Sequence, residues 1–487
     1  MLPYTGDYTE HIDSTTNNFK YYTFTPRPLM NGNMYQMDDE LAALLTEAHR
    51  NIGFLEGLIK FAPNRDSFTE LMLLKECTYS RMIDCNGPDF KDVLTSCGTG
   101  KGDISPIMNL ESAYRTAMNM EIAAPDLSRI CGIALYGGAE AISIDVRDHQ
   151  TFWLDAKTNL RGYNPTAPNA VLPALADISA YLYDSEDDPL IQAALVHYQF
   201  EMIHPFEKYN GVVGRILIFM VLQKIVGKAL SGLCFSEYLF FNKNEYFDML
   251  RTTQYSGGYV RWIKFFLRII NEAARNSVAL LKKYEEKIKL DEERLRSAIP
   301  QTRSFWSVYE YLKAFPVTSI PIAAKHLSLS YNSVSKAFST LHENKLIMQR
   351  SNTTRNRIWE YSNLDFIFTL PSINETTCDY SEYDTSELDG FQDDLLAAIE
   401  SLNPYPEKLN ALSYENKGAV QFVADFPCEQ CGKFGISIDE TFLTIGRCCY
   451  CGYENELAKC ERCGEMLNVD ILEHGLCPSC AAYIDNQ

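Results

Sequence analysis

The chain has 487 residues, a formal net charge of −20 and 46% hydrophobic residues. This length predicts about three domains, and the apolar content is enough to fill at least one large core. The negative charge argues against nonspecific binding of nucleic acid or anionic membrane by the whole chain, although it is compatible with a local basic patch. The N-terminal residues lack a basic segment followed by an apolar run, and the apolar helix candidates are too short for a bilayer. We therefore expect a soluble, cytoplasmic protein with no membrane partner.

Residues 1–107 form the first predicted region. Apolar residues at three- and four-residue spacing predict a helix over 38–60, and a similar pattern predicts a second helix over 68–83. Residues 86–106 contain several glycines and a Gly-Pro pair, so we expect them to be mostly loop.

Helical patterns dominate the second predicted region, residues 108–298. A polar, proline-broken segment at 162–169 interrupts them and predicts an extended loop or hairpin. Charges of both signs recur at helical spacing over 282–296, which predicts a solvated helix leading into the next domain.

The run IHPFEKYNGVVGR at 203–215 is the strongest candidate for a reaction site. A proline disfavours helix in the residue before it, so His204 is expected at a helix end. A new helix is predicted to begin at about Asn210, and its first N–H groups together with Arg215 predict an anion site. A histidine beside such a site is suited to act as a general base. The alternative is a core histidine followed by a helix-capping glycine turn.

Residues 299–365 are predicted to be a winged helix-turn-helix, with three helices and then two strands over 346–350 and 358–361. Ser330 is the expected N-cap of the third helix. Polar and basic residues on this helix and in the wing predict a DNA contact surface within 304–361, although winged helices also bind proteins. The DNA-binding candidates are Asn332, Ser333, Lys336, Arg355 and Arg357, with Arg350 also in the wing.

Residues 366–420 are rich in acidic side chains and predict a flexible linker. Residues 421–487 contain eight of the chain's fifteen cysteines, in four Cys-x-x-Cys pairs. Each pair presents two thiolates to one tetrahedral ion, which predicts a double zinc ribbon with two structural Zn²⁺ ions. Sequential pairing is favoured, and cross-braced pairing or redox dithiols are the alternatives. The predicted ligands are Cys428, Cys431, Cys448, Cys451, Cys460, Cys463, Cys477 and Cys480.

The run at 203–215 resembles the motif HPFx(D/E)GNGRxxR of the Fic (Fido) family. The helix before it, the segment at 236–250 after it and the stretch FTPRPL at 24–29 also resemble parts of that family. The resemblance covers residues 20–365. It implies a mainly α fold, made of a Fic-type helical domain with a small β-hairpin flap and a winged helix domain, followed by the double zinc ribbon.

Members of the Fic family transfer AMP from ATP to a protein hydroxyl, so the resemblance implies this activity here. His204 matches the family's general base. The flap at 162–171 is implied to dock an extended segment of the protein target by strand addition. The implied nucleotide-binding residues are Phe206, Lys208, Asn210, Gly211, Gly214 and Arg215.

Three positions depart from the family motif. Lys208 stands where the family has its Mg²⁺-binding acid, Tyr209 replaces a glycine, and Val212 replaces the first arginine. A lysine does not ligate Mg²⁺, so the use of this metal is left open. Either Lys208 supplies the positive charge, or Glu207 ligates the metal, or ATP transfer is lost.

The segment 75–85 resembles the family's inhibitory helix, (S/T)xxxE(G/N). Ser80 matches its first position and Asp84 stands at its glutamate, so an Asp84–Arg215 pair is implied as a brake on the enzyme. An ordinary helix end is the alternative. The competing function is a catalytically impaired Fic-fold regulator that binds DNA or a protein partner through its winged helix and zinc ribbons. The target, the activating signal and the oligomeric state are left open.

Overall fold

The chain divides into two compact units, residues 1–153 with 161–373 and residues 374–487 with 154–160. None of the helices among the described residues combines the length and apolar character needed to cross a bilayer. The computed structural model describes residues 5–13, 19–31, 34–85, 87–138, 143–151, 153–154, 161–226, 232–256, 258–298, 302–350, 357–362, 364–369, 422–427, 434–439, 442–448, 454–459 and 466–468.

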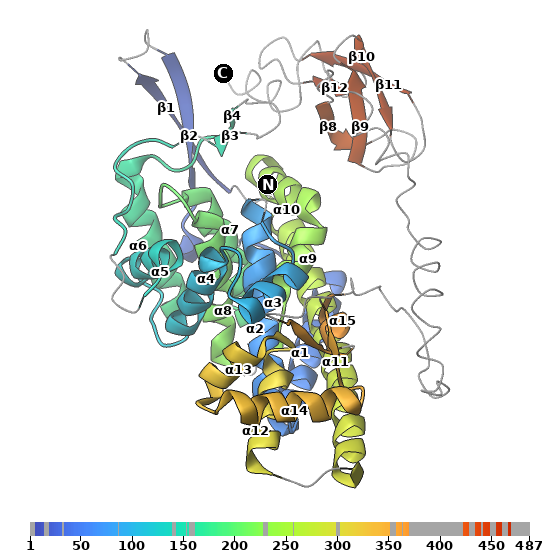
Figure 1. Ribbon diagram of the computed structural model, residues 1–487. Helices are drawn as coiled ribbons and strands as arrows, with labels where there is room; N and C mark the ends of the chain where they lie inside the picture. Colours follow the sequence, from blue (N-terminus) through green and yellow to red (C-terminus); the bar gives the residue numbers. More distant parts are fainter. Residues whose placement is uncertain are drawn as a thin grey trace. The chain divides into compact units, whose positions relative to one another are not determined.

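The first unit is mainly helical and is built around α7 (Pro189–Ile203) and α8 (Asn210–Val226), which pack against each other (Figure 1). All residues of α7 from Leu190 to Ile203 are buried, so this helix is enclosed by protein on every side. The surrounding helices are α1 (Asp39–Phe61), α2 (Arg65–Asp84), α4 (Ser105–Ala117), α5 (Ala124–Tyr136), α6 (Pro168–Asp184), α9 (Phe235–Phe241), α10 (Lys243–Ser256) and α11 (Tyr259–Ala298).

The two helices predicted near the N-terminus are confirmed as α1 and α2. Asp38 caps α1, because its side chain accepts a hydrogen bond of 2.8 Å from the Leu41 N–H. Helix α2 begins three residues earlier than predicted, at Arg65, and ends at Asp84.

The prediction that residues 86–106 are mostly loop is wrong, because α3 (Phe90–Thr99) lies within them. Asp89 caps this helix by accepting a hydrogen bond of 2.7 Å from the Asp92 N–H. Its glycines have specific roles. A Cβ at Gly98 would lie 1.7 Å from the Val317 carbonyl oxygen, and Gly100 ends the helix with a φ of 63°.

The predicted flap at 162–171 is only partly extended. Strand β3 (Trp153–Leu154) pairs with β4 (Arg161–Tyr163), but α6 begins at Pro168, so residues 168–171 are helical. Proline is favoured in the first turn of a helix, where its missing N–H costs nothing.

An N-terminal hairpin, which the sequence did not predict, contacts the segment after β4. Its antiparallel strands are β1 (Gly6–Asp13) and β2 (Phe19–Pro26). The Phe24 N–H donates to the Asn164 carbonyl at 3.1 Å, and the Thr166 hydroxyl donates to the Phe24 carbonyl at 3.0 Å.

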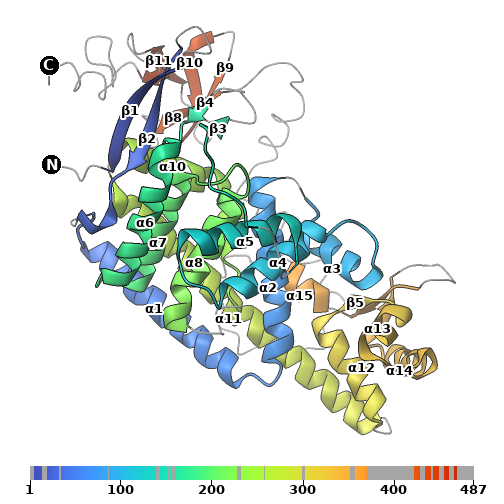
Figure 2. The ribbon, with the colours of Figure 1, turned by 90° about the vertical axis from the view of Figure 1, so that its left-hand side faces the viewer.

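Residues 303–361 contain three helices and a three-stranded sheet of order β5-β7-β6. Ser330 is the N-cap of the third helix, as predicted, and its hydroxyl accepts from the Ser333 N–H at 3.2 Å. Strand β5 is an addition to the two predicted strands, and it packs against α3 (Figure 2). The elements are α12 (Arg303–Ala314), β5 (Val317–Thr318), α13 (Ile320–Leu327), α14 (Tyr331–Glu343), β6 (Ile347–Gln349) and β7 (Trp359–Tyr361), followed by α15 (Leu364–Thr369).

The second unit contains one antiparallel sheet of order β12-β11-β10-β9-β8. Seven of the eight paired cysteines lie outside the described residues, and Cys448 is the last residue of β10. The predicted linker at 366–420 begins inside α15 (Leu364–Thr369), so its first four residues are helical, and the rest of it lies outside the described residues. The strands are β8 (Phe422–Pro427), β9 (Phe434–Asp439), β10 (Phe442–Cys448), β11 (Glu454–Lys459) and β12 (Met466–Asn468).

Candidate functional site

The candidate site is the turn that joins α7 to α8. His204 ends α7 in a left-handed conformation, with a φ of 51°, and its N–H donates to the Phe200 carbonyl at 2.9 Å. Tyr209 has a φ of 68°, which is unfavourable for a residue with a bulky side chain. The guanidinium of Arg81, on α2, lies 4.8 Å from the centre of the Tyr209 ring. Stacking against Arg81 is one contact that offsets this strain.

A side chain closes the turn on itself. The Asn210 Oδ1 accepts from the Phe206 N–H at 2.8 Å, and its Nδ2 donates to the Phe206 carbonyl at 2.7 Å. Phe206 is fully buried and lies near Phe200, so it anchors the turn in the core. Asn210 therefore shapes the loop directly, in addition to standing at the start of α8.

Arg147 is a buried clamp on the same turn, and the sequence motif did not include it. Its Nε donates to the His204 carbonyl at 2.7 Å and its Nη2 donates to the Ile203 carbonyl at 3.1 Å. The Nη2 also donates to the Thr166 carbonyl, and the Arg147 N–H donates to the Pro205 carbonyl at 2.9 Å. The only sequence signal was a single arginine just before the proline-broken segment, which is too common a pattern to identify a clamp.

His204 is held as a neutral imidazole. Burial, followed by the positive charge of Arg147, lowers the pKa of His204 to about 4. Its Nδ1 is buried and has no hydrogen-bond partner among the described residues. A neutral imidazole at physiological pH retains a lone pair that can accept a proton.

Arg215 is almost completely buried, with 1% of its surface exposed, and three hydrogen bonds join it to the end of α2. Its Nη2 lies 2.8 Å from Asp84 Oδ2 and 2.7 Å from the Ser80 carbonyl, and its Nε donates to the Ser80 hydroxyl at 2.9 Å. The structure thus contains the Asp84–Arg215 contact, with Ser80 as a further partner of the arginine.

The Asp84 carboxylate also approaches the first turn of α8. A Cβ built on Gly211 would lie 2.8 Å from Asp84 Oδ1 and 3.0 Å from Asp84 Oδ2. Glycine at 211 therefore allows a carboxylate to lie against the N-terminal backbone of α8, where the helix dipole and the free N–H groups favour an anion.

Gly214 faces α7 rather than Asp84. A Cβ at this position would lie 2.5 Å from Glu201 Oε1 and 3.2 Å from His197 Nδ1, both on α7. His197 also bonds the Gly214 carbonyl at 3.0 Å and the Tyr246 hydroxyl at 2.9 Å. Burial raises the pKa of Glu201 to about 8, so this carboxyl is mostly protonated at neutral pH. Gly214 thus contributes close packing between α7 and α8.

Two buried acidic residues attach the middle of α2 to α9. The Lys75 ammonium lies 2.8 Å from Glu237 Oε1, and both side chains are fully buried. Glu76 accepts from the Ser236 N–H at 2.8 Å and from the Tyr114 hydroxyl at 2.9 Å. Removing one member of such a pair is costly, so the middle of α2 is firmly held.

The three departures from the family motif occupy different environments. Val212 is fully buried, whereas Lys208 is exposed, and its carbonyl accepts from the Cys131 thiol at 3.7 Å. Glu207 is exposed and lies 3.3 Å from His149 Nε2. No cluster of three or more His, Cys, Asp or Glu side chains suited to a metal occurs within the described residues. The donor set at Lys208 does not fit Mg²⁺, which takes oxygen ligands.

Of the DNA-binding candidates, Asn332, Ser333 and Lys336 lie on α14, and Arg357 lies just before β7. Asn332, Lys336 and Arg357 are exposed and Ser333 is half-buried, whereas Arg355 lies outside the described residues. Arg350 contacts the protein itself, because its Nη1 donates to the Thr95 hydroxyl at 2.6 Å and its Nε lies 3.0 Å from Glu360.

Residues 129–222, which include the α7–α8 turn, match the family model of the Fic/DOC family. Over 65 residues the chain is 35% identical to a protein adenylyltransferase fic-1 of Caenorhabditis briggsae and, over the same length, 32% identical to the fic-1 of Caenorhabditis elegans. Each match covers 13% of this chain and 13% of the relative, so the chain spans a small part of the length of these relatives.

Solved structures of Fic proteins are also similar. A Fic family protein from Desulfovibrio desulfuricans G20 covers 67% of this chain and 97% of its own, with a TM-score of 0.44 and 17% identity. Residues 134–508 of Fic-1 from C. elegans cover 51% of this chain and 74% of that chain, with a TM-score of 0.38 and 18% identity.

Proposed function

We propose that this chain, a Fic family protein, transfers AMP from ATP to a hydroxyl group of a protein target and is held inactive by Asp84. The α7–α8 turn lies within the matched residues, and the matched curated relatives are adenylyltransferases by name. The activity of those relatives supports the proposal for this chain, and the geometry of the turn supports it independently.

The single observation that carries the proposal is the position of the Asp84 carboxylate. It lies against Gly211 and Arg215 at the N-terminus of α8, so this spot already holds a negative group. A phosphate has the same charge sign and takes the same kind of donors. We infer that Asp84 occupies the place of an ATP phosphate and must leave before ATP binds productively.

The proposed reaction uses few protein groups. The target's hydroxyl oxygen attacks the α-phosphorus of ATP, the bond from that phosphorus to the leaving pyrophosphate breaks, and His204 accepts the hydroxyl proton. The α8 N–H groups and Arg215 would offset the negative charge on the phosphates, and exposed Lys208 would add a second cation. No step is assigned to Mg²⁺, because the donor set at Lys208 does not fit it.

His204→Ala is expected to lower AMP transfer by about 10²–10⁴-fold, the usual contribution of a general base. Incubation of the purified variant with labelled ATP and cell lysate measures this effect, preferably in an Asp84→Ala background. The control is His326→Ala, which removes an exposed histidine on α13. A His204→Ala variant that still transfers label would contradict only the general-base role. No label and no ATP binding by calorimetry with any variant would overturn the transferase proposal.

For the protein target we propose docking on the β3–β4 hairpin by addition of an extended segment. The Asn164 carbonyl is already used by β2, and α6 begins at Pro168. The docking edge is therefore shorter than the predicted 162–171 and is centred on β4, Arg161–Tyr163.

A regulatory protein without catalysis is the second candidate function. Two observations favour it: Val212 is buried where the family has an arginine, and Arg215 is enclosed by α2. In this case residues 303–361, which we propose are a winged helix, would bind DNA through Asn332 and Lys336 on the exposed face of α14 and through Arg357 before β7. Fluorescence anisotropy with duplex DNA at several salt concentrations tests this candidate, and the absence of salt-dependent binding would argue against DNA as the partner.

The four cysteine pairs are proposed to hold two structural Zn²⁺ ions as a double zinc ribbon. The spacing of the four Cys-x-x-Cys pairs along the sequence supports this proposal, and Cys448 at the end of β10 is the one of these cysteines that the structure describes. Metal analysis of the purified chain is expected to give about two zinc ions per chain, and a chelator is expected to unfold this unit without changing AMP transfer by the first unit. A chain that contains no zinc and has oxidised cysteine pairs would favour redox dithiols instead.

A further inference from the structure

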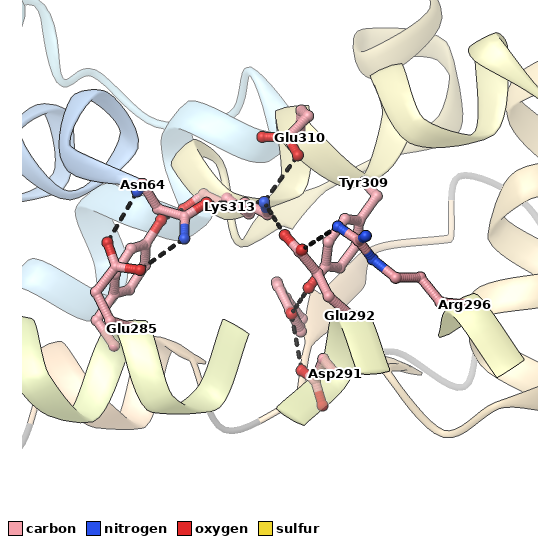
Figure 3. A network of polar contacts seen from close by, with 10 residues as sticks. Asn64, Glu285, Asp291, Glu292, Arg296, Tyr309, Glu310 and Lys313 are labelled. Atoms are coloured by element: carbon pink, nitrogen blue, oxygen red, sulfur yellow. Dashed lines mark hydrogen bonds and ion pairs between the residues drawn. The ribbon is translucent and has the colours of Figure 1, made fainter. Parts of the chain in front are cut away.

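Helix α2, which ends at Asp84, is held at its N-cap residue, Asn64, by two other helices (Figure 3). Its N-cap residue Asn64 makes no capping bond to its own helix. Instead, Glu285 of α11 accepts from the Asn64 N–H at 2.8 Å and from the Asn64 Nδ2 at 2.7 Å. The Asn64 Oδ1 accepts from the Lys313 ammonium of α12 at 2.8 Å. The N-cap residue of α2 is therefore held in place by side chains of α11 and α12.

Lys313 is a fixed partner for Asn64. Its side chain is buried, and its ammonium also lies 2.8 Å from Glu292 and 2.7 Å from Glu310 (Figure 3). All three of its N–H groups thus have an acceptor, and two of the acceptors are carboxylates. Bonds of this charge-assisted kind are short and directional, so the position of the ammonium follows the position of α12.

The other end of α2 is attached to the same part of the chain. After Asp84 the chain enters α3, and Gly98 of α3 packs so closely on β5 that a Cβ would lie 1.7 Å from the Val317 carbonyl oxygen. The Arg350 guanidinium, which follows β6, donates to the Thr95 hydroxyl of α3 at 2.6 Å. Residues 303–361 therefore contact both the start of α2 and the helix that follows its end.

A helix transmits displacement along its axis, because its backbone hydrogen bonds make it stiff. Helix α2 has 20 residues and spans about 30 Å. Its middle is held on α9 by the Lys75–Glu237 and Glu76–Ser236 contacts. With the middle fixed, a shift of the Asn64 end is expected to tilt the helix and move the Asp84 end.

We infer that Lys313 is a positioning residue, which holds the Asp84 carboxylate on Arg215 by gripping Asn64 at the far end of α2. Residues 303–361 thereby control the inhibitory Asp84–Arg215 contact, and a ligand or partner that moves α12 breaks this contact. The effect on activity rests on the proposed AMP transfer, whereas the coupling between Lys313 and Asp84 through α2 does not.

Hydrogen–deuterium exchange of the full chain tests the coupling without reference to activity. In Asn64→Ala, which leaves Lys313 its two carboxylates, the amides of residues 80–85 are expected to exchange about three- to tenfold faster than in the wild type. The matched control is Asn51→Ala, which removes a hydrogen bond of 2.9 Å between α1 and α11 and should leave residues 80–85 unchanged.

Lys313→Met removes the same Lys313–Asn64 hydrogen bond from its α12 side. It therefore shows whether an effect of Asn64→Ala is only a local effect of that substitution. Glu292 keeps Arg296 as a partner, so the variant does not strand a buried charge. Faster exchange at residues 80–85 in both variants supports the inference. Faster exchange confined to residues 64–70 in both, with residues 80–85 unchanged, overturns it.

Activity separates this inference from the proposed function. If both hold, Asn64→Ala raises AMP transfer, and adding it to Asp84→Ala gives no further increase, because both act through the same carboxylate. If exchange at residues 80–85 rises and no variant transfers label, the coupling stands and the transferase proposal fails. If Asp84→Ala transfers label but exchange at residues 80–85 is unchanged in Asn64→Ala, the transferase proposal stands and the coupling fails.

Discussion

Asp84→Ala is expected to raise AMP transfer by about 10–100-fold, the usual range for removing a coupling between two sites. In the wild type the Asp84 carboxylate lies 2.8 Å from the Arg215 Nη2 and against Gly211. An ATP phosphate would have to displace it. Removing the carboxylate leaves the arginine and the α8 N-terminus available, while Ser80 keeps Arg215 in place through two hydrogen bonds.

The same variant is expected to be less stable without ligand. Arg215 is buried and loses its charged partner, which costs about 2–3 kcal/mol of unfolding free energy because Asp84 itself is partly exposed. ATP should restore stability, since a ligand at a hundredfold excess over its Kd contributes about 2.7 kcal/mol. Thermal unfolding with and without ATP measures both effects.

Asp66→Ala is the matched control, because Asp66 is an exposed aspartate in the first turn of the same helix. It should change neither AMP transfer nor the effect of ATP on unfolding. An Asp84→Ala variant that transfers no more label than the wild type, and whose unfolding ATP does not shift, would show that Asp84 is structural only.

Arg147→Met is expected to give the largest loss of stability among the site variants. The guanidinium donates to the carbonyls of Ile203, His204 and Thr166 in a buried environment. Replacing it leaves these acceptors without a donor, which costs about 3–5 kcal/mol of unfolding free energy. The turn that carries His204 should then loosen, so AMP transfer should fall together with stability.

The pKa of His204 in Arg147→Met distinguishes a positioning role of Arg147 from a general loss of structure. Arg147 is one cause of the low pKa of His204, so Arg147→Met is expected to raise that pKa from about 4 toward the usual value for histidine. NMR titration of labelled histidines measures it, with His204→Ala to identify the resonance. The exposed Arg65→Ala serves as the control. An unchanged titration in a folded Arg147→Met chain would contradict the clamp.

Local sequence patterns predicted many of the elements well. Apolar spacing placed α1 almost to the residue and a capping residue placed the start of α14, because both signals act within one or two helical turns. They failed for residues 90–99, where glycines suggested a loop. There Gly98 serves close packing against Val317, more than two hundred residues away, and no local pattern records such a contact.

The motif at 203–215 located the site but did not identify all the residues that hold it in place. His204, Asn210 and Arg215 were identified from the motif, whereas the clamp at Arg147 and the buried Glu201 were not. Arg147 acts through carbonyl oxygens of the main chain, which every residue has. Its role therefore leaves no trace in the side chains around it.

The sequence by itself determined where the α7–α8 turn lies, that His204 ends a helix, and that the metal position of the motif carries a lysine. These follow from residue types within a few positions of each other. Only the tertiary structure decided that Asp84 lies on Gly211, that Arg147 clamps the turn and that Lys313 grips the start of α2. Each of these contacts joins residues at least 56 positions apart, so they exist only after the helices have packed.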